Sequence, residues 1–140
     1  MFEEAIRYAV YSALIGDSTL TGLVEGVYDY VAQPADAGQD SDFPYVVIGD
    51  NTYVPWDTDT ETGADATITI HTWSRYKGRQ EVADIQDAIY RALHRQGIPV
   101  DGAATVGCEM ENSELLPMDG NTSHGVQRYR LIVDGGKEVL

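Results

Sequence analysis

Three acidic residues stand at alternate positions in a short polar run of this 140-residue chain. Asp57, Asp59 and Glu61 are separated by threonines and followed by Gly63. Because hard cations such as Ca²⁺ bind several carboxylate oxygens, the run suggests a calcium loop. The detailed pattern does not fit, since Gly63 comes one place late for the sharp turn and Ile68 stands where the bidentate acid belongs. We interpret the run as a solvated acidic loop and predict no metal site.

The remaining reactive side chains show no pattern of an enzyme. His71, His94 and His124 are far apart in the chain and lack the spacing of metal ligands. Cys108 is the only cysteine, which excludes an internal disulfide and is typical of a reducing compartment. We interpret it as a half-buried strand residue. With no nucleophile-elbow serine and no glycine-rich phosphate loop, the sequence indicates neither catalysis nor a cofactor.

The charge is strongly negative and unevenly distributed. The formal net charge is −14, and between Arg7 and Arg75 there are 11 Asp or Glu residues but no Lys or Arg. A short basic segment, Arg75, Lys77 and Arg79, precedes a helical pattern. Gripping nucleic acid requires clustered Lys and Arg, so the overall charge argues against it. Solubility, a salty environment, and a surface along which another polyanion slides all remain compatible with this charge.

Hydrophobic periodicity locates the central elements. Residues 66–73 alternate apolar and polar side chains, which predicts a strand with one buried face. The spacing of the apolar residues then changes, and Val82, Ile85, Ile89 and Leu93 fall on one face of a predicted helix over 79–93. We expect Ile85 and Ile89 in the core. Gly97 is predicted to end this helix in the left-handed conformation.

The other elements follow from similar patterns. Apolar residues at helical spacing predict an amphipathic helix over 2–15, and the polar run 33–42 predicts a surface loop. The acidic linker 51–63 is predicted to be mobile and to join two strands of a hairpin. The remaining expected elements are a short helical turn or loop at 17–26, strands at 27–31, 45–48, 105–116 and 126–133, and a frayed tail at 134–140.

This order predicts an α+β fold in which two helices pack on one face of a mainly antiparallel sheet. Residues 1–140 are expected to form one domain. No apolar run approaches the length of a membrane span, and we expect neither a secretory signal nor contact with a membrane.

The ordered set of motifs resembles the phage tail terminator, or tail-completion, proteins at the head-proximal end of long non-contractile tails. The resemblance covers residues 3–133 and rests on an opening helix, two strands and a strand–helix unit. Its most recognisable stretches are Gly26-Val27-Tyr28, Phe43-Pro44-Tyr45-Val46-Val47-Ile48-Gly49 and Ile68-Thr69-Ile70-His71-Thr72-Trp73-Ser74, followed by Gly78, the helix 81–93 and a strand near 129–133. The chain departs from the family in its few basic residues and its acidic linker.

The resemblance implies a structural virion protein, made in the host cytoplasm, without catalysis or cofactor. It implies a ring, usually a hexamer, that caps the tail tube, ends its polymerisation and joins it to the head connector. We expect DNA to pass through the ring without sequence-specific binding. Asp57, Asp59 and Glu61 are then candidates for a lumen or partner loop, and Arg75, Lys77 and Arg79 for an inter-subunit contact. The alternatives are another virion ring component, such as a connector or tube subunit, and a small α+β ligand-binding module or enzyme.

Overall fold

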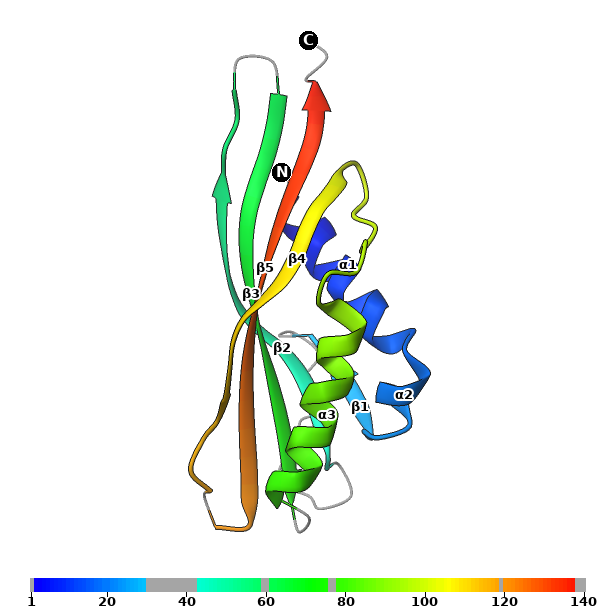
Figure 1. The fold of residues 1–140 in the computed structure, drawn as a ribbon, viewed down its shortest axis with the longest axis vertical. Helices are drawn as coiled ribbons and strands as arrows, with labels where there is room; N and C mark the ends of the chain where they lie inside the picture. The colour runs from blue at the N-terminus through cyan, green and yellow to red at the C-terminus, as the bar shows by residue number, and fades with distance from the viewer. Residues whose placement is uncertain (1, 30–42, 59–60, 76–77, 119, 138–140) are drawn as a thin grey trace.

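The computed structural model describes residues 2–29, 43–58, 61–75, 78–118 and 120–137. These residues form three helices and five strands (Figure 1). In chain order they are α1 (Glu3–Ile15), α2 (Ser18–Thr21), β1 (Gly26–Tyr28), β2 (Tyr45–Pro55), β3 (Glu61–Arg75), α3 (Gly78–Leu93), β4 (Ala104–Leu115) and β5 (Thr122–Lys137).

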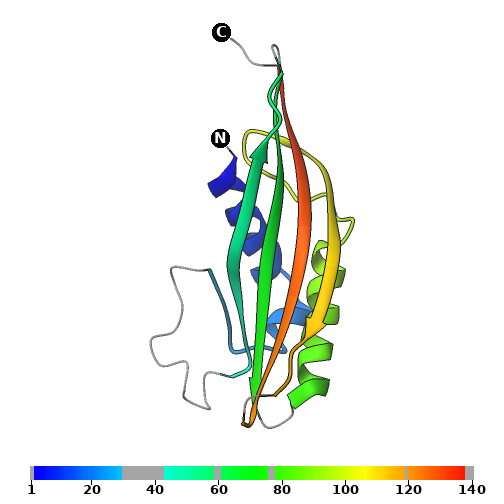
Figure 2. The ribbon, with the colours of Figure 1, turned by 90° about the vertical axis from the view of Figure 1, so that its left-hand side faces the viewer.

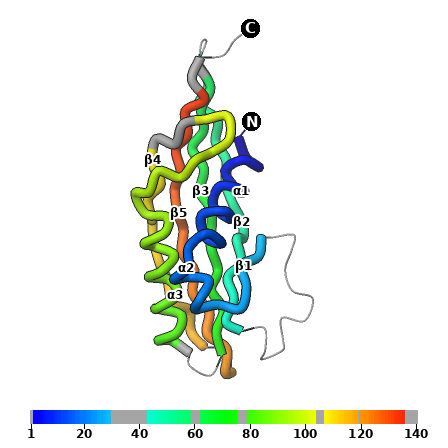
Figure 3. Tube along the Cα trace, turned by 90° about the vertical axis from the view of Figure 1, so that its right-hand side faces the viewer, coloured from blue at the N-terminus to red at the C-terminus, as the bar shows by residue number. Residues whose placement is uncertain are grey.

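The strands form one sheet, in the order β1-β2-β3-β5-β4. Only β1 and β2 pair in parallel, and the other three pairs are antiparallel. The predicted α+β class and mainly antiparallel sheet are therefore confirmed. The structure has three helices where the sequence pattern predicts two, because Asp17 caps a short additional helix by accepting a hydrogen bond from the Leu20 N–H. All three lie over the same face of the sheet (Figure 3). We call this covered side the inner face and the opposite side the outer face.

The linker 51–63 is much shorter than predicted. Residues 51–55 belong to β2 and pair with β3 from Asn51↔Ile68 to Pro55↔Ala64, while β3 already begins at Glu61. The expectation of a long mobile loop is wrong for these residues. Cross-strand backbone hydrogen bonds order this segment, and its Tyr53 side chain packs against the core and accepts a hydrogen bond of 2.9 Å from the Phe2 N–H.

The final strand is also longer than predicted. β5 continues to Lys137, which pairs with Glu61, so residues 134–137 are part of the sheet rather than a frayed tail. By contrast β1 ends at Tyr28, earlier than the predicted strand over 27–31. The predicted loop over 33–42 lies outside the described residues, as do residues 138–140.

The core lies between the inner face of the sheet and the helices. Ile85 and Ile89 of α3 are fully buried, as predicted from their spacing. Large residues that share this core include Ile6, Val10 and Leu14 of α1 and Ile68, Ile70, Leu131 and Val133 of the sheet. Cys108 of β4 is also completely buried, more deeply than expected, and burial raises the pKa of its thiol to about 12. The thiol is therefore neutral and unreactive.

The end of α3 differs from the prediction. Arg95, with a φ of 58°, takes the left-handed conformation, whereas Gly97 does not. The Arg95 N–H donates a hydrogen bond of 2.7 Å to the carbonyl oxygen of Cys108 in β4. This tertiary bond fixes where the chain turns, so the nearest glycine is not used. Among the described residues, no helix is long and apolar enough to span a membrane.

Candidate functional site

The outer face of the sheet is free of helices (Figure 2). Along β3, every second residue from Ala64 to Ser74 is buried beneath the helices, and the residues between them, from Asp65 to Arg75, are half-buried on the outer face. These outer residues divide into a charged half near Asp65 and an aromatic half near Trp73. Because no helix of the described residues covers this face, it is the natural place to look for a site.

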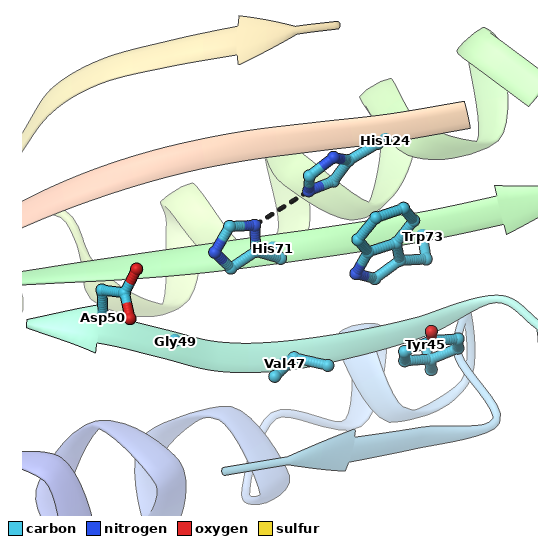
Figure 4. A pocket seen from close by; sticks show the side chains of 7 residues that line it. All are labelled: Tyr45, Val47, Gly49, Asp50, His71, Trp73 and His124. Atoms are coloured by element: carbon cyan, nitrogen blue, oxygen red, sulfur yellow. Dashed lines mark hydrogen bonds between the residues drawn. The ribbon is translucent and has the colours of Figure 1, made fainter. Parts of the chain in front are cut away.

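The aromatic half contains a pair of histidines that the sequence does not bring together. His71 of β3 and His124 of β5 are joined by a hydrogen bond of 2.8 Å between Nδ1 and Nε2 (Figure 4). The Trp73 ring stacks on His124 with the ring centroids 3.7 Å apart. The antiparallel register places Trp73 opposite His124, so the arrangement follows directly from β3–β5 pairing.

A hollow of about 250 Å³ adjoins these rings. Its other walls are Tyr45, Val47, Gly49 and Asp50 of β2. The His71 ring lies over Gly49 so closely that a Cβ atom there would come within 2.7 Å of it. Glycine at this position therefore leaves the space that the histidine occupies.

The histidine pair is uncharged at neutral pH. Burial, and the neighbouring His71, lower the pKa of His124 to about 4. Burial also lowers the pKa of His71; Asp50 opposes this shift, and Arg128 adds to it. One ring nitrogen of the pair must therefore donate and the other accept.

The chemistry of this site is that of a recognition surface. Among the residues that the structure describes, no three His, Cys, Asp or Glu side chains are placed to hold a metal ion. The third histidine, His94, lies elsewhere, accepts a hydrogen bond from the Met110 N–H and stacks on Tyr90. The hollow instead offers aromatic and aliphatic walls, with the histidine pair and the Asp50 carboxylate at its edge, and such a surface can accept a side chain of a partner.

A second apolar cluster continues the aromatic half toward β1. Phe43, Tyr45 and Val47 are buried, and Tyr28 and Trp73 pack against them. The Arg75 guanidinium lies over the Phe43 ring at 4.2 Å from its centroid, and its Nε donates to the Thr122 hydroxyl. Arg75 is therefore engaged within its own subunit.

In the charged half of the outer face, each arginine of β5 has a carboxylate partner on a neighbouring strand. Arg130 binds Asp65 across the β3–β5 pair, with Nε 2.9 Å from Oδ1, and this hydrogen bond lowers the pKa of Asp65. Arg128 approaches Glu114 at 3.4 Å. The arginines of β5 thus meet carboxylates of the same chain.

The predicted site residues lie at opposite ends of β3. Asp57 is exposed beside the β2–β3 turn, where its Oδ1 accepts a hydrogen bond from the Gly63 N–H at 3.3 Å. Glu61 is the first residue of β3, and Arg75 is the last. At ~3.3 Å per residue, the strand separates them by about 46 Å. Arg79 is exposed in the first turn of α3.

Two of the predicted site residues, Asp59 and Lys77, lie outside the described residues. Sequence reasoning missed the histidine pair because 53 residues separate its members. The only local signal was that His71 and Trp73 alternate on one face of a predicted strand.

Comparison with known proteins identifies the family. Residues 8–134 match the family described as "Tail completion protein gp17". The tail completion protein gp17 of Bacillus phage SPP1 is 30% identical over 98 residues, which cover 69% of this chain and 72% of that protein.

Solved structures show the same fold. A chain in the virion of a native gene transfer agent particle superimposes with a TM-score of 0.82 at 21% identity, covering 96% of this chain and 98% of that one. The structure of SPP1 gp17 gives a TM-score of 0.57 at 25% identity, covering 91% and 88%. Because the family match spans most of the chain and the SPP1 relative supports it, this chain belongs to the tail completion protein gp17 family and is a protein of the virion tail.

Proposed function

We propose that this chain assembles into a closed ring, a hexamer by resemblance, at the head-proximal end of the tail. The ring caps the tail tube, ends its polymerisation and joins the tube to the head connector. DNA passes through its lumen without sequence-specific binding. The partners of the ring are therefore the tail tube protein, the connector protein and other copies of this chain.

The observation that carries this proposal is that most of the described arginine side chains contact partners within their own chain. Four arginines are paired with carboxylates of the same chain, and Arg75 is bound to Phe43 and Thr122. The four ion pairs are Arg91–Asp87, Arg95–Glu109, Arg128–Glu114 and Arg130–Asp65. Four of the nine Lys and Arg residues are thus paired with carboxylates of the same chain. The surplus acids give the net charge of −14, and we expect them to face solvent because burying an unpaired charge is costly. A ring built from such subunits has a wall that repels phosphate, along which DNA slides without adhering.

The acidic turn between β2 and β3 is our candidate for the lumen or partner loop. The β2–β3 hairpin and the end of β5 extend past the helices (Figures 1 and 2). Asp57 lies beside the tip of this extension, with Asp59 and Glu61 next along the chain. Carboxylates at a projecting tip reach a partner or a channel before the rest of the subunit does.

The basic segment is a less favourable inter-subunit candidate than the sequence suggests. Arg75 already has partners in its own subunit, which leaves Arg79 as the described member available to a neighbour. The basic segment and the acidic turn lie at opposite ends of β3, so they meet across a ring interface only if β3 runs along the circumference of the ring rather than along its axis.

The capping function is tested by polymerising the tail tube protein of the same virion with and without this chain. We expect tubes to stop growing when the chain is present, and length distributions from electron micrographs to narrow. Tubes that grow to the same lengths with and without the chain would contradict the proposal.

The role of the acidic turn is tested separately in the assembled virion. Asp57→Asn with Asp59→Asn and Glu61→Gln should leave capping intact but slow DNA ejection. A matched control neutralises three exposed acids elsewhere, Glu25→Gln, Asp84→Asn and Asp101→Asn, and should eject DNA at the parent rate. Equal ejection rates in the two variants would exclude this turn from the lumen.

A further inference from the structure

The inner face of the sheet changes from apolar to polar side chains toward the end where β3 leads into α3 (Figure 1). The buried row of β3 continues from two isoleucines to a threonine and a serine. The paired row of β5 continues from a leucine and a tyrosine to a glutamine, a glycine and a serine. We call the four buried polar residues of the described chain the polar floor: Thr72, Ser74, Ser123 and Gln127. The polar floor therefore gathers at one end of the sheet.

Three atoms of the polar floor are buried without a hydrogen-bond partner in the described part of the chain. They are Oγ1 of Thr72, Oγ of Ser123 and Oε1 of Gln127. Two further atoms of this kind, Nη1 of Arg7 and the Tyr129 hydroxyl oxygen, lie outside the floor. A buried polar atom without a partner costs free energy, because its hydrogen bonds to water are lost and nothing replaces them. Exposing the floor to water would therefore recover part of that cost.

The first half of α3 covers the polar floor and is tied to it by hydrogen bonds. The Ser74 hydroxyl donates to the Glu81 carboxylate. One turn further along the helix, Nε2 of Gln127 donates to the Gln86 carbonyl oxygen at 3.1 Å. The part of α3 that lies between these two bonds is thus held over polar side chains.

Apolar packing begins only later in α3. Val82 is fully buried, yet among the described residues Ile85 is the first of α3 that belongs to the apolar core. Val82 instead lies against Gly125, where a Cβ atom would come within 2.6 Å of the Val82 Cγ1 atom and within 2.4 Å of Nε2 of Gln86. The glycine therefore permits this close approach of helix and strand.

We propose that residues 78–84, the part of α3 that precedes Ile85, open as a unit while the rest of the subunit stays folded. Opening hydrates the unpartnered atoms of the floor, which offsets part of the packing that is lost. The second half of α3, anchored in the apolar core by Ile89 and Leu93, has no comparable gain. A groove of about 320 Å³ between α3 and β4 adjoins Gln127 and gives water a path to the floor.

This inference goes beyond the proposed ring and does not depend on it. A segment that opens at low cost can take a second position when a partner binds, whereas the sheet and the remaining core cannot. Arg79 lies in this segment and is exposed. Opening therefore changes the position from which this arginine reaches a partner.

Amide hydrogen exchange of the whole subunit, followed residue by residue by NMR, tests the opening. The N–H groups of residues 82–86 donate to the carbonyl groups of residues 78–82, so all of these bonds break when the segment opens. We expect them to exchange at least about tenfold faster than the N–H groups of residues 90–93, and with a weaker dependence on urea. Equal rates with equal urea dependence would mean that α3 opens only when the whole subunit unfolds, which would overturn the proposal.

Substitutions in the floor distinguish this opening from ordinary fraying of a helix end. Thr72→Val with Ser123→Ala removes two unpartnered hydroxyls, so the closed form becomes more favourable and exchange of residues 82–86 should slow about tenfold or more. Thr69→Val, on the outer face of the same strand, is the matched control and should leave these rates unchanged. Fraying that does not expose the floor predicts the same rates in both variants, and that result would overturn the proposal.

A glycine substitution should act in the opposite direction. Gly125→Ala places a methyl group against Val82 and Gln86, so exchange of residues 82–86 should become at least about tenfold faster. Gly107→Ala, which has open space at its Cβ position, is the control and should leave these rates unchanged. Unchanged or slower exchange in Gly125→Ala would contradict the proposed opening.

Discussion

Alternate residues of the same strands form the two faces of the central sheet, but the two faces are covered differently. On β3, Ile68 and Ile70 point to the inner face and are sealed by helices of the same chain. On the same strand, His71 and Trp73 point to the outer face, where no element of the described chain lies over them. The inner face therefore stabilises the subunit, whereas the outer face is where we look for contact with a partner. Substitutions on the two faces should therefore have separable effects on folding and on assembly.

The largest expected effect is on the inner face. Ile89→Ala should lower the free energy of unfolding by ~2–5 kcal/mol, because it removes a fully buried side chain and leaves a cavity. Urea denaturation measures this. The matched control is Ile132→Ala, an isoleucine that is half-buried on the outer face of β5 and should cost clearly less. If Ile132→Ala lowered the free energy of unfolding as much as Ile89→Ala does, the proposed difference between the two faces would be wrong.

A glycine substitution tests the packing of the histidine pair. Gly49→Ala should destabilise the subunit by ~1–3 kcal/mol, because the new methyl group would displace the His71 ring and disturb its bond to His124. Gly107→Ala is the control: this strand glycine has open space at its Cβ position, so its replacement should be neutral or slightly stabilising. Chemical denaturation measures the free energy of unfolding of both variants. Equal changes in the two variants would contradict the described geometry.

The same pair predicts a pH dependence. The folded pKa of His124, about 4, lies below the 6.5 of an ordinary histidine, so the unfolded chain binds more protons between these values. The contribution of His124 to stability should therefore be complete well above pH 6.5 and be lost progressively as the pH falls from 6.5 toward 4. Asp50 and Arg128 act electrostatically on His71 in opposite directions. His71→Gln with His124→Gln should flatten the decline in melting temperature, and a slope as steep as that of the parent would contradict this origin.

The smallest effect is expected in the charged half of the outer face. Asp65→Asn removes the partner of Arg130 but leaves the strand pairing intact. Because exposed ion pairs contribute little and are screened by salt, the melting temperature should fall slightly, and the difference from the parent should vanish in about 1 M salt. A large, salt-independent loss would mean that this half also belongs to the folding core.

The sequence predicts the inner face better than the outer one for a physical reason. The spacing of apolar residues within one helix or strand shows which of its side chains face the core. Ile85 and Ile89 are therefore identified from their spacing alone. Residues Asn51–Pro55 are ordered by pairing with β3. The local sequence of this segment does not reveal that pairing. The bond between His71 and His124 depends on the β3–β5 register, which spans a large sequence separation.

The candidate site divides in the same way. The acidic run at Asp57 is visible in the sequence because composition alone defines it. The hollow is not, since it is assembled from three strands. The turn at Arg95 was missed because a tertiary hydrogen bond to Cys108, rather than the nearest glycine, fixes it.

The central claim is that this tail completion protein forms a ring on one end of the tail tube. Electron microscopy of tubes incubated with the protein tests it most directly. The account predicts a closed ring at the head-proximal end alone. Tubes that carry the protein at neither end, and tails that keep their normal length without it, would contradict the account.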